Sequence, residues 1–307
     1  MNELLGILAH DILPIFIVMG LGFAFDRRFK PDVHSLTRIT FYIFSPCLVF
    51  SSLVKSELAG AEMLQIAAFT VGVSLIMGLL GLAASRLLRL DARATAGLVL
   101  VCMFVNAGNY GLGVNLRAFN EEALARAVVY FTTSTLLVYT LGVWVAAGSD
   151  GSGWRTALRR TLAVPPMYAA VAAILVRALA IDMTQPALEP LLAGIDLAGR
   201  AAIPLMLAIL GMQLSRTSVT AHLRPSAVAT GLRLVVAPVI AWGAAAVIGL
   251  SGVARQASIL EASMPAAVIN IILATEYHAA PALVTNAVIV STLCSPITLT
   301  LVIALLK

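Results

Sequence analysis

The chain has 307 residues, of which 60% are hydrophobic and 11% are charged, and its mean hydropathy is +0.98. Soluble proteins contain about 25% charged residues, so this composition excludes a water-soluble globular fold and predicts an all-α polytopic membrane protein. The net charge of +5 comes from Lys and Arg spread over loops without a basic tract, which excludes nucleic-acid binding and is typical of membrane orientation.

Ten apolar segments follow one another along the chain, each long enough to cross a lipid bilayer as a helix of about 20 residues. We expect the spans at residues 5–25, 36–54, 63–88, 94–118, 123–147, 164–181, 197–214, 225–250, 254–275 and 281–306. The longest polar interval follows the fifth span, and its Gly/Ser start and basic end are typical of a linker. The chain therefore divides into a first half at 1–147, a cytoplasmic linker at 148–163 and a second half at 164–307.

Basic residues are shared unequally between the two sides of this layout. With the N-terminus outside, the cytoplasmic loops contain Arg27, Arg28, Lys30, Arg38, Arg86, Arg89, Arg93, Arg155, Arg159, Arg160, Arg216 and Arg224. The outer loops contain fewer basic residues and most of the acidic ones. Because positive charge is retained on the cytoplasmic side, both termini are predicted to face outward.

The fourth apolar segment is interrupted. After the apolar run 94–105 comes Asn106-Ala-Gly-Asn-Tyr-Gly-Leu-Gly113, where a lipid-facing helix would have Leu or Val. Each glycine weakens a helix by about 1 kcal/mol relative to alanine. Open backbone at membrane depth is tolerated only where it is buried in protein or lines a cavity. The interruption is therefore a candidate binding site.

The two halves resemble each other, which predicts an inverted repeat. Pro46 in the second span and Pro204 in the seventh are 158 residues apart (204 − 46). Arg93 and Arg255, before the fourth and ninth spans, are 162 apart (255 − 93). Five spans per half is an odd number, so the second copy enters the membrane upside down, as in many secondary transporters.

This repeat places a counterpart of the interruption near residues 264–275. There Pro265 interrupts an apolar helix, and Asn270 follows it. Proline removes a backbone donor and breaks a helical hydrogen bond, which leaves carbonyl groups free. Two interrupted spans at equivalent positions indicate a transport site at the interface of the repeats.

Motifs in both halves resemble those of one known family. The matching residues are Pro46-Cys-Leu-Val-Phe50, the Asn106…Gly111 interruption, Ile203-Pro-Leu205 with Gly211-Met-Gln-Leu214, and Met264-Pro265 with Glu276-Tyr277. On these residues the chain resembles the auxin efflux carrier family, which includes bacterial permeases for dicarboxylates such as malate and the plant auxin exporters. It departs from many relatives at Gly113, where they have proline.

The resemblance implies a fold similar to that of the bile-acid/sodium symporters. Such a fold has ten transmembrane helices in two inverted five-helix repeats, with broken fourth and ninth helices that cross near the membrane midplane. The resemblance also implies the bacterial inner membrane as the location and is the sole reason to expect a homodimer.

Amides and opened helix ends at the two interruptions suit an anion. The N-terminus of a helix offers free N–H groups and a partial positive charge, and asparagine side chains add donors. The candidate substrate-binding residues are Asn106, Gly108, Asn109, Tyr110, Gly111, Pro265, Asn270 and Pro46. Alternatives stay open: the asparagines satisfy each other or cap the broken ends, Tyr110 packs at an interface, the glycines allow close backbone approach, and Pro46 only kinks its span.

Glu261 and Arg233 are the ionisable residues farthest from any loop. They lie in antiparallel neighbouring spans, at depths that would let them pair across the midplane. A charge at that depth is costly and is a functional hypothesis by default. Three interpretations stay open: a structural ion pair, a coupling proton on Glu261, or attraction of the substrate anion by Arg233.

The remaining motifs argue against other classes of protein. The histidines and the three cysteines lack metal-ligand or disulfide spacing, and no hydrolase, protease or nucleotide-binding motif occurs, so we expect no metal, no cofactor and no enzyme. The sequence favours a secondary active transporter of a small organic anion that works by alternating access, with H⁺ or Na⁺ as candidate coupling ions. The alternative is an anion channel, or a facilitative uniporter without ion coupling.

Overall fold

The computed structural model describes residues 2–147, 164–183, 185–216 and 223–307, and these residues form helices and turns with no β-strand. The helices, in which η marks a π-helix, are α1 (Asn2–Ile7), η1 (Leu8–Ile12), α2 (Leu13–Phe29), α3 (Val33–Ile39), η2 (Thr40–Phe44), α4 (Ser45–Lys55), α5 (Gly60–Leu87), α6 (Ala92–Met103), η3 (Ala107–Gly111), α7 (Leu112–Ala118), α8 (Glu121–Leu137), η4 (Val138–Gly142), α9 (Val143–Ala147), α11 (Pro165–Ala178), α12 (Glu189–Ser215), α13 (Leu223–Gly231), η5 (Leu232–Val236), α14 (Ala237–Ile248), α15 (Gly252–Ala262), α16 (Ile269–Glu276) and α17 (Pro281–Leu306).

Seven continuous helical runs are long and apolar enough to cross a membrane. They are Leu4–Phe29, Val33–Lys55, Gly60–Leu87, Glu121–Ala147, Glu189–Ser215, Leu223–Ile248 and Pro281–Leu306. Each coincides with a span that the apolar segments predict, which confirms the all-helical, multi-pass class. Hydrogen-bonded helices are the expected solution because every backbone polar group in lipid must be satisfied within the protein.

The other three predicted spans contain shorter helices. The fourth is divided between α6 and the η3–α7 segment, and the ninth is divided between α15 and α16. The sixth is α11, with 14 residues. The interruptions thus fall where the sequence predicts them, whereas the layout of ten spans in two inverted repeats stays a prediction. The predicted linker at 148–163 lies outside the described residues.

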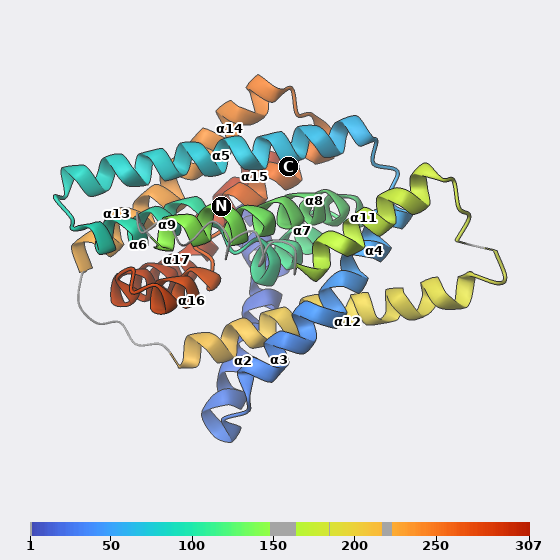
Figure 1. The fold of residues 1–307 in the computed structure, drawn as a ribbon, viewed down its shortest axis with the longest axis horizontal. Helices are drawn as coiled ribbons and strands as arrows, with labels where there is room; N and C mark the ends of the chain where they lie inside the picture. The colour runs from blue at the N-terminus through green and yellow to red at the C-terminus, as the bar shows by residue number, and fades with distance from the viewer. Residues whose placement is uncertain (1, 148–163, 184, 217–222) are drawn as a thin grey trace.

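The helices associate in two groups. In the α12 bundle, α2, α4, α11 and α12 pack on one another. In the α5 bundle, α5, α6, α8, α13, α14, α15 and α17 do so. Figure 1 shows α5 crossing the upper part of the view beside α14, with α2 and α12 across the lower part. The η3–α7 segment contacts both α8 and α12, so the first interruption lies where the two bundles meet.

Two glycines allow α2 and α12 to approach at backbone distance. A Cβ added at Gly22 would lie 2.1 Å from the carbonyl oxygen of Ala208, and one at Gly211 would lie 1.9 Å from that of Met19. Small residues are common between membrane helices because lipid supplies no hydrophobic force for association, and dispersion contacts depend on close packing. The α12 bundle is therefore a closely packed unit.

Ion pairs join helices within each bundle. In the α12 bundle, the carboxylate of Asp26 accepts from Arg216 at 2.6 Å and raises the pKa of that guanidinium above its ordinary value. In the α5 bundle, Arg126 Nε lies 2.7 Å from Glu62 Oε1. These links stabilise the bundles individually. Between the bundles, Lys307 after α17 pairs at 2.6 Å with Asp11 of η1, the π-helix that leads into α2.

Candidate functional site

The two interruptions meet in the interior of the protein. Val105 and Ala266 form an isolated antiparallel bridge. The backbone N–H of Asn106 donates to the carbonyl oxygen of Pro265 at 2.8 Å, and that of Ala267 donates to Phe104 at 3.0 Å. An interrupted helix leaves backbone groups unpaired, and burying them unpaired is costly. Each interruption therefore supplies the hydrogen bonds that the other lacks.

The side chain of Arg233 binds the C-terminal ends of α6 and α15, the two helices that precede the interruptions. Its side chain extends from η5, is 1% exposed, and donates from its two terminal nitrogens to the carbonyl oxygens of Cys102 and Ala262. These carbonyls belong to the last turns of α6 and α15, where no intrahelical donor remains. A cation is also favourable at the partly negative C-terminal end of a helix. One guanidinium thus caps both broken helices.

Of the three interpretations that the sequence leaves open for Arg233 and Glu261, the structure does not contain the structural ion pair. No ion pair joins the two side chains, because the guanidinium is engaged by the helix ends. Glu261 instead accepts from Asn115 Nδ2 at 3.0 Å. Depth along each span could be read from the sequence, but the direction in which each side chain points around its helix could not.

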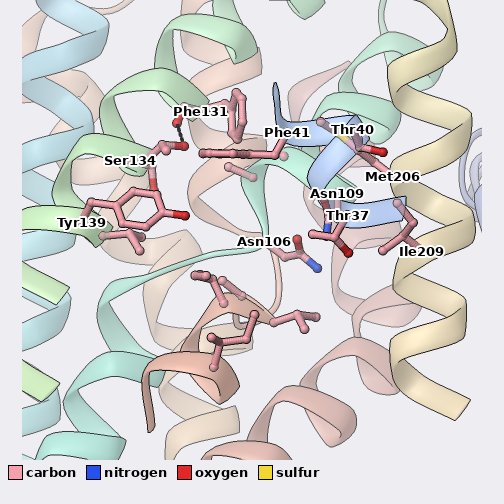
Figure 2. A pocket seen from close by; sticks show the side chains of 18 of the residues that line it. Thr37, Thr40, Phe41, Asn106, Asn109, Phe131, Ser134, Tyr139, Met206 and Ile209 are labelled. Carbon is pink, nitrogen blue, oxygen red and sulfur yellow. Dashed lines mark hydrogen bonds between the residues drawn. The ribbon is translucent and has the colours of Figure 1, made fainter. Parts of the chain in front are cut away.

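A cavity of about 470 Å³ lies beside the interruptions, between the two bundles. Its wall includes three of the predicted site residues, Asn106, Gly108 and Asn109. Figure 2 shows the side chain of Asn106 in the middle of this cavity, with Asn109 on one side and Ser134 and Tyr139 on the other. This volume is within the usual range of small-molecule sites, roughly 300–1,000 Å³.

Three of the π-helices form parts of the cavity wall. Residues of η2, η3 and η4 line it, including Phe41 and Tyr139. π-Helical turns widen a helix locally and occur often at functional sites. Most of the remaining wall is aromatic or aliphatic, with Phe131, Met206 and Ile272 as examples. The cavity therefore suits a molecule with an apolar body and few polar groups.

Asn106 presents a free donor to this cavity. The residue is 4% exposed, and its Nδ2 atom has no hydrogen-bond partner among the described residues. It immediately precedes η3, and the first residues of η3 and of α16 also line the cavity. Leaving a buried donor unpaired costs about 1–3 kcal/mol. A ligand acceptor, above all an anionic oxygen, would satisfy it at the positive ends of two helices.

Charged side chains at the cavity wall are few. Among the described lining residues, the potential cations are His34 and Arg38 and the acid is Glu276. His34 and Arg38 are exposed, so they stand at the mouth of the cavity and not at its centre. The deep part of the site therefore relies on amide groups and helix ends, without a fixed charge.

Four of the other predicted residues support the site from behind its wall. Asn270 is fully buried and donates from Nδ2 to Phe104 O at 3.1 Å, so its amide holds the interruption together. The carbonyl oxygen of Pro265 accepts from the backbone N–H of Asn106. The hydroxyl of Tyr110 lies 3.1 Å from Ser295 Oγ. Gly111 lies against Glu261, since a Cβ there would be 2.2 Å from Oε2.

Pro46 lies in the first turn of α4 and is half-buried, away from the residues that line the cavity. Conversely, the sequence did not single out Thr37 and Thr40, which the structure adds to the cavity wall from the second span. Two threonines one turn apart in an apolar span are the signal that could have found them. Phe131 gives no sequence signal, because a half-buried aromatic residue on an apolar helix is typical of ordinary core packing.

A second, larger cavity of about 960 Å³ occupies the other end of the bundle interface. Its wall is more charged and contains Lys55, Arg117, Arg126, Arg200, Glu57, Glu121, Glu122 and Asp196. Along α12, Met206 lines the first cavity while Ile203 and Leu207 line the second. A Cβ at Gly113 would lie 3.2 Å from Ile203 and 3.4 Å from Leu207, so contact between the η3–α7 segment and α12 separates the two cavities.

A multi-pass helical protein in which two interrupted helices meet beside an internal cavity has the construction of a membrane transporter. Sequence comparison agrees with this class. The model of the membrane transport protein family, to which the auxin efflux carriers belong, matches residues 7–152 and 154–303. The chain therefore belongs to this family.

Two archaeal relatives have the same extent. An uncharacterized transporter of Methanothermobacter thermautotrophicus is 28% identical over 298 residues, which cover 95% of this chain and 96% of the relative. Another uncharacterized transporter, from Methanocaldococcus jannaschii, is 23% identical over 291 residues, covering 92% and 94%. The family and both relatives are named as transporters and not as enzymes.

Proposed function

We propose that this protein is a secondary transporter of a small organic anion, which binds in the cavity beside the two interruptions. The observation that supports this function best is the buried, unpartnered Nδ2 of Asn106 at the positive ends of η3 and α16. Such a donor set stabilises a carboxylate without a fixed charge that would hold it permanently. Transport requires release, so binding by amides and helix ends suits a carrier.

The cavity chemistry narrows the substrate class. A carboxylate would lie near Asn106 and Asn109, and the aromatic and aliphatic wall would enclose an apolar body. Arg38 and His34 at the mouth would attract anions from the adjacent aqueous phase. Auxin-like and dicarboxylate-like molecules both fall within this class of substrate.

Alternating access would expose the site to each side in turn. The cavity of about 470 Å³ includes Arg38, on the predicted cytoplasmic side, and the charged cavity includes Lys55, on the predicted outer side. Movement of one bundle against the other at the Gly113–Ile203 contact would close the first and open the second. We place both termini outside a bacterial inner membrane, with ten spans in two inverted repeats that cross at the interruptions.

The second candidate is an anion channel or an uncoupled uniporter. A channel needs a continuous polar path, whereas the two cavities are separated by the apolar side chains of Ile203 and Leu207. This separation favours a carrier. The coupling ion, H⁺ or Na⁺, involves Glu261 or Arg233 as the buried ionisable candidates, and a homodimer is the proposed assembly.

Binding tests this proposal most directly. A thermal-shift screen of the purified protein against mono- and dicarboxylates should identify ligands that raise Tm, because a ligand that binds only the folded state stabilises it. N106L should keep the ligand-free Tm and bind the same anion about 10–100-fold more weakly, as expected for a hydrogen bond to a charged group worth about 1.5–3 kcal/mol. Q65A, which removes an exposed amide from α5, is the matched control.

Proteoliposomes then separate a carrier from a channel. Saturable uptake with counterflow is expected of a carrier, since the loaded site must cross in both directions. Linear, voltage-driven flux without exchange would overturn the carrier proposal in favour of the channel. Equal affinity of N106L and the unmodified protein would remove Asn106 from the site.

A further inference from the structure

The buried carboxyl group of Glu261 has no ion-pair partner within the described residues. Glu261 lies in the last turn of α15 and is fully buried. Its Oε1 atom accepts from Asn115 Nδ2 at 3.0 Å, and the same Nδ2 donates to Gly111 O at 3.1 Å. The two other atoms of this pair, Glu261 Oε2 and Asn115 Oδ1, have no hydrogen-bond partner among the described residues.

These two unpartnered atoms are both acceptors, and one proton satisfies both. A protonated carboxyl group and a carboxamide form a cyclic pair, in which the amide N–H donates to one carboxyl oxygen while the acid O–H donates to the amide oxygen. The first bond of such a pair is present between Asn115 and Glu261. We propose that Glu261 and Asn115 form a proton-binding site, which is occupied in this conformation and exchanges its proton during the transport cycle.

The surroundings of Glu261 favour the neutral acid. Burying an ionised carboxylate is costly unless a cation or several donors compensate it. Arg233, the nearby cation, is held by the ends of α6 and α15. Among the described elements packed on α15, α8 contributes the buried Tyr130 and η3 the buried Tyr110.

The remaining charged residues of the helices packed on α15, and of α15 itself, lie near helix ends. These residues are Glu62, Arg86, Arg117, Glu121, Glu122, Arg126, Arg255 and Lys307. None of them forms an ion pair with Glu261 in the described structure. A proton is therefore the compensation that this geometry accommodates.

Proton exchange at this site would act on the proposed substrate site through η3. Glu261 Oε2 lies against the backbone of Gly111, at the place where a Cβ would be only 2.2 Å away. Gly111 ends η3, the same π-helix that contributes Gly108 and Asn109 to the cavity wall. Release of the proton to water would leave a carboxylate that needs new donors, so η3 or α7 must move to solvate it. This coupling step rests on the proposed function, whereas proton binding itself does not.

Infrared difference spectroscopy of the purified protein in lipid nanodiscs tests proton binding without any substrate. A protonated-carboxyl C=O band that shifts in D₂O should be present at neutral pH, should disappear on alkalinisation, and should be absent in E261Q. N115L should shift this band because the acid loses its acceptor, a change that simple packing of the carboxyl would not produce. E62Q, which removes the surface-paired carboxylate of α5, should leave the band unchanged. Absence of a Glu261-dependent band would overturn the proposal, and so would its loss on adding Na⁺ at constant pH.

Transport in proteoliposomes tests proton exchange. In E261Q, the glutamine carboxamide can form the same two hydrogen bonds with Asn115, but it cannot exchange a proton. The variant should therefore bind substrate as the unmodified protein does. Its uptake should lose all stimulation by a pH gradient. Uptake by the unmodified protein should rise with the gradient, and so should uptake by E62Q. A pH-independent rate in the unmodified protein, together with an intact infrared band, would overturn the exchange step alone. Failure to find any transported anion would count against the proposed function and leave the spectroscopic result standing.

Discussion

The two interruptions contain similar residues, but their asparagine side chains differ in their hydrogen bonds. At the first, Asn106 precedes η3 and presents an unpartnered amide to the cavity. At the second, Asn270 is fully buried and donates from Nδ2 to the carbonyl oxygen of Phe104. One asparagine is available to a ligand, and the other holds the backbone in place. The two interruptions therefore share the Val105–Ala266 bridge but differ in which asparagine Nδ2 atom has a hydrogen-bond partner among the described residues.

Removal of Arg233 should have the largest effect, because it caps both interruptions at once. R233M would leave the carbonyls of Cys102 and Ala262 without donors in the protein interior. At about 1–3 kcal/mol for each unpaired group, we expect several kcal/mol of destabilisation. Thermal unfolding in detergent measures it, with R255M as the exposed control. R233K should recover part of the loss, and an unchanged Tm in R233M would refute the capping role.

Crowding at the first interruption should have the next largest effect. G111A places a methyl group against the carboxyl of Glu261, where a Cβ would lie 2.2 Å from Oε2. Overpacking of this kind costs about 1–3 kcal/mol. Its Tm should therefore fall, whereas G6A, where no atom lies within 4 Å of an added Cβ, should change little. Restoration of the Tm in G111A by a smaller residue at 261, as in E261A, would show that this contact is responsible.

The two asparagines can be compared directly. N270L removes one of the two donors to Phe104 O and leaves the N–H of Ala267 in place, so the folded state should lose about 0.5–1.5 kcal/mol, the net contribution of one hydrogen bond. N106L removes a donor that has no partner, so its stability should be retained while ligand affinity falls. Urea or thermal unfolding and ligand titration are measured on both variants. Equal losses of stability in N106L and N270L would contradict this difference between the two asparagines.

The smallest effect is expected far from both interruptions. Lys55 and Asp196 form a partly exposed ion pair of 2.7 Å at the second cavity, with side-chain exposures of 45% and 19%. Exposed pairs contribute about 0–1 kcal/mol, so K55M should lower stability only slightly. Its effect on transport at low and high ionic strength is the more informative measurement. A loss as large as that of R233M would mean that the outer cavity, and not the interruptions, organises the fold.

Much of the local structure could be predicted from residue order. Long apolar runs predicted the seven membrane-length helices, because a bilayer requires about 20 apolar residues per span. The glycine and asparagine cluster at 106–113 predicted a break, since glycine and proline are the residues that a helix tolerates least. The second break was located through the repeat spacing, and the structure brings both together at the Val105–Ala266 bridge.

Side-chain direction and partnership depended on tertiary structure. The depths of Arg233 and Glu261 suggested a pair, but rotation about each helix axis directs one side chain to helix ends and the other to Asn115. Thr37 and Thr40 contribute to another part of the cavity wall. They lie in the second predicted span, which contains neither of the two interruptions and has an ordinary apolar composition. Residues of different bundles come to line one cavity only when the two bundles pack against each other.

Sequence by itself thus determined the class of the protein, its long helices and the place of both interruptions. These features follow from local chemistry, namely hydropathy, glycine and proline. Only the tertiary structure decided which amide stays free, which carbonyls one arginine caps, and where a buried carboxyl finds its acceptor. Those outcomes depend on contacts between different helices, such as Arg233 with Cys102 and Asn115 with Glu261, which are 131 and 146 positions apart, and their geometry is set by the packing of whole helices.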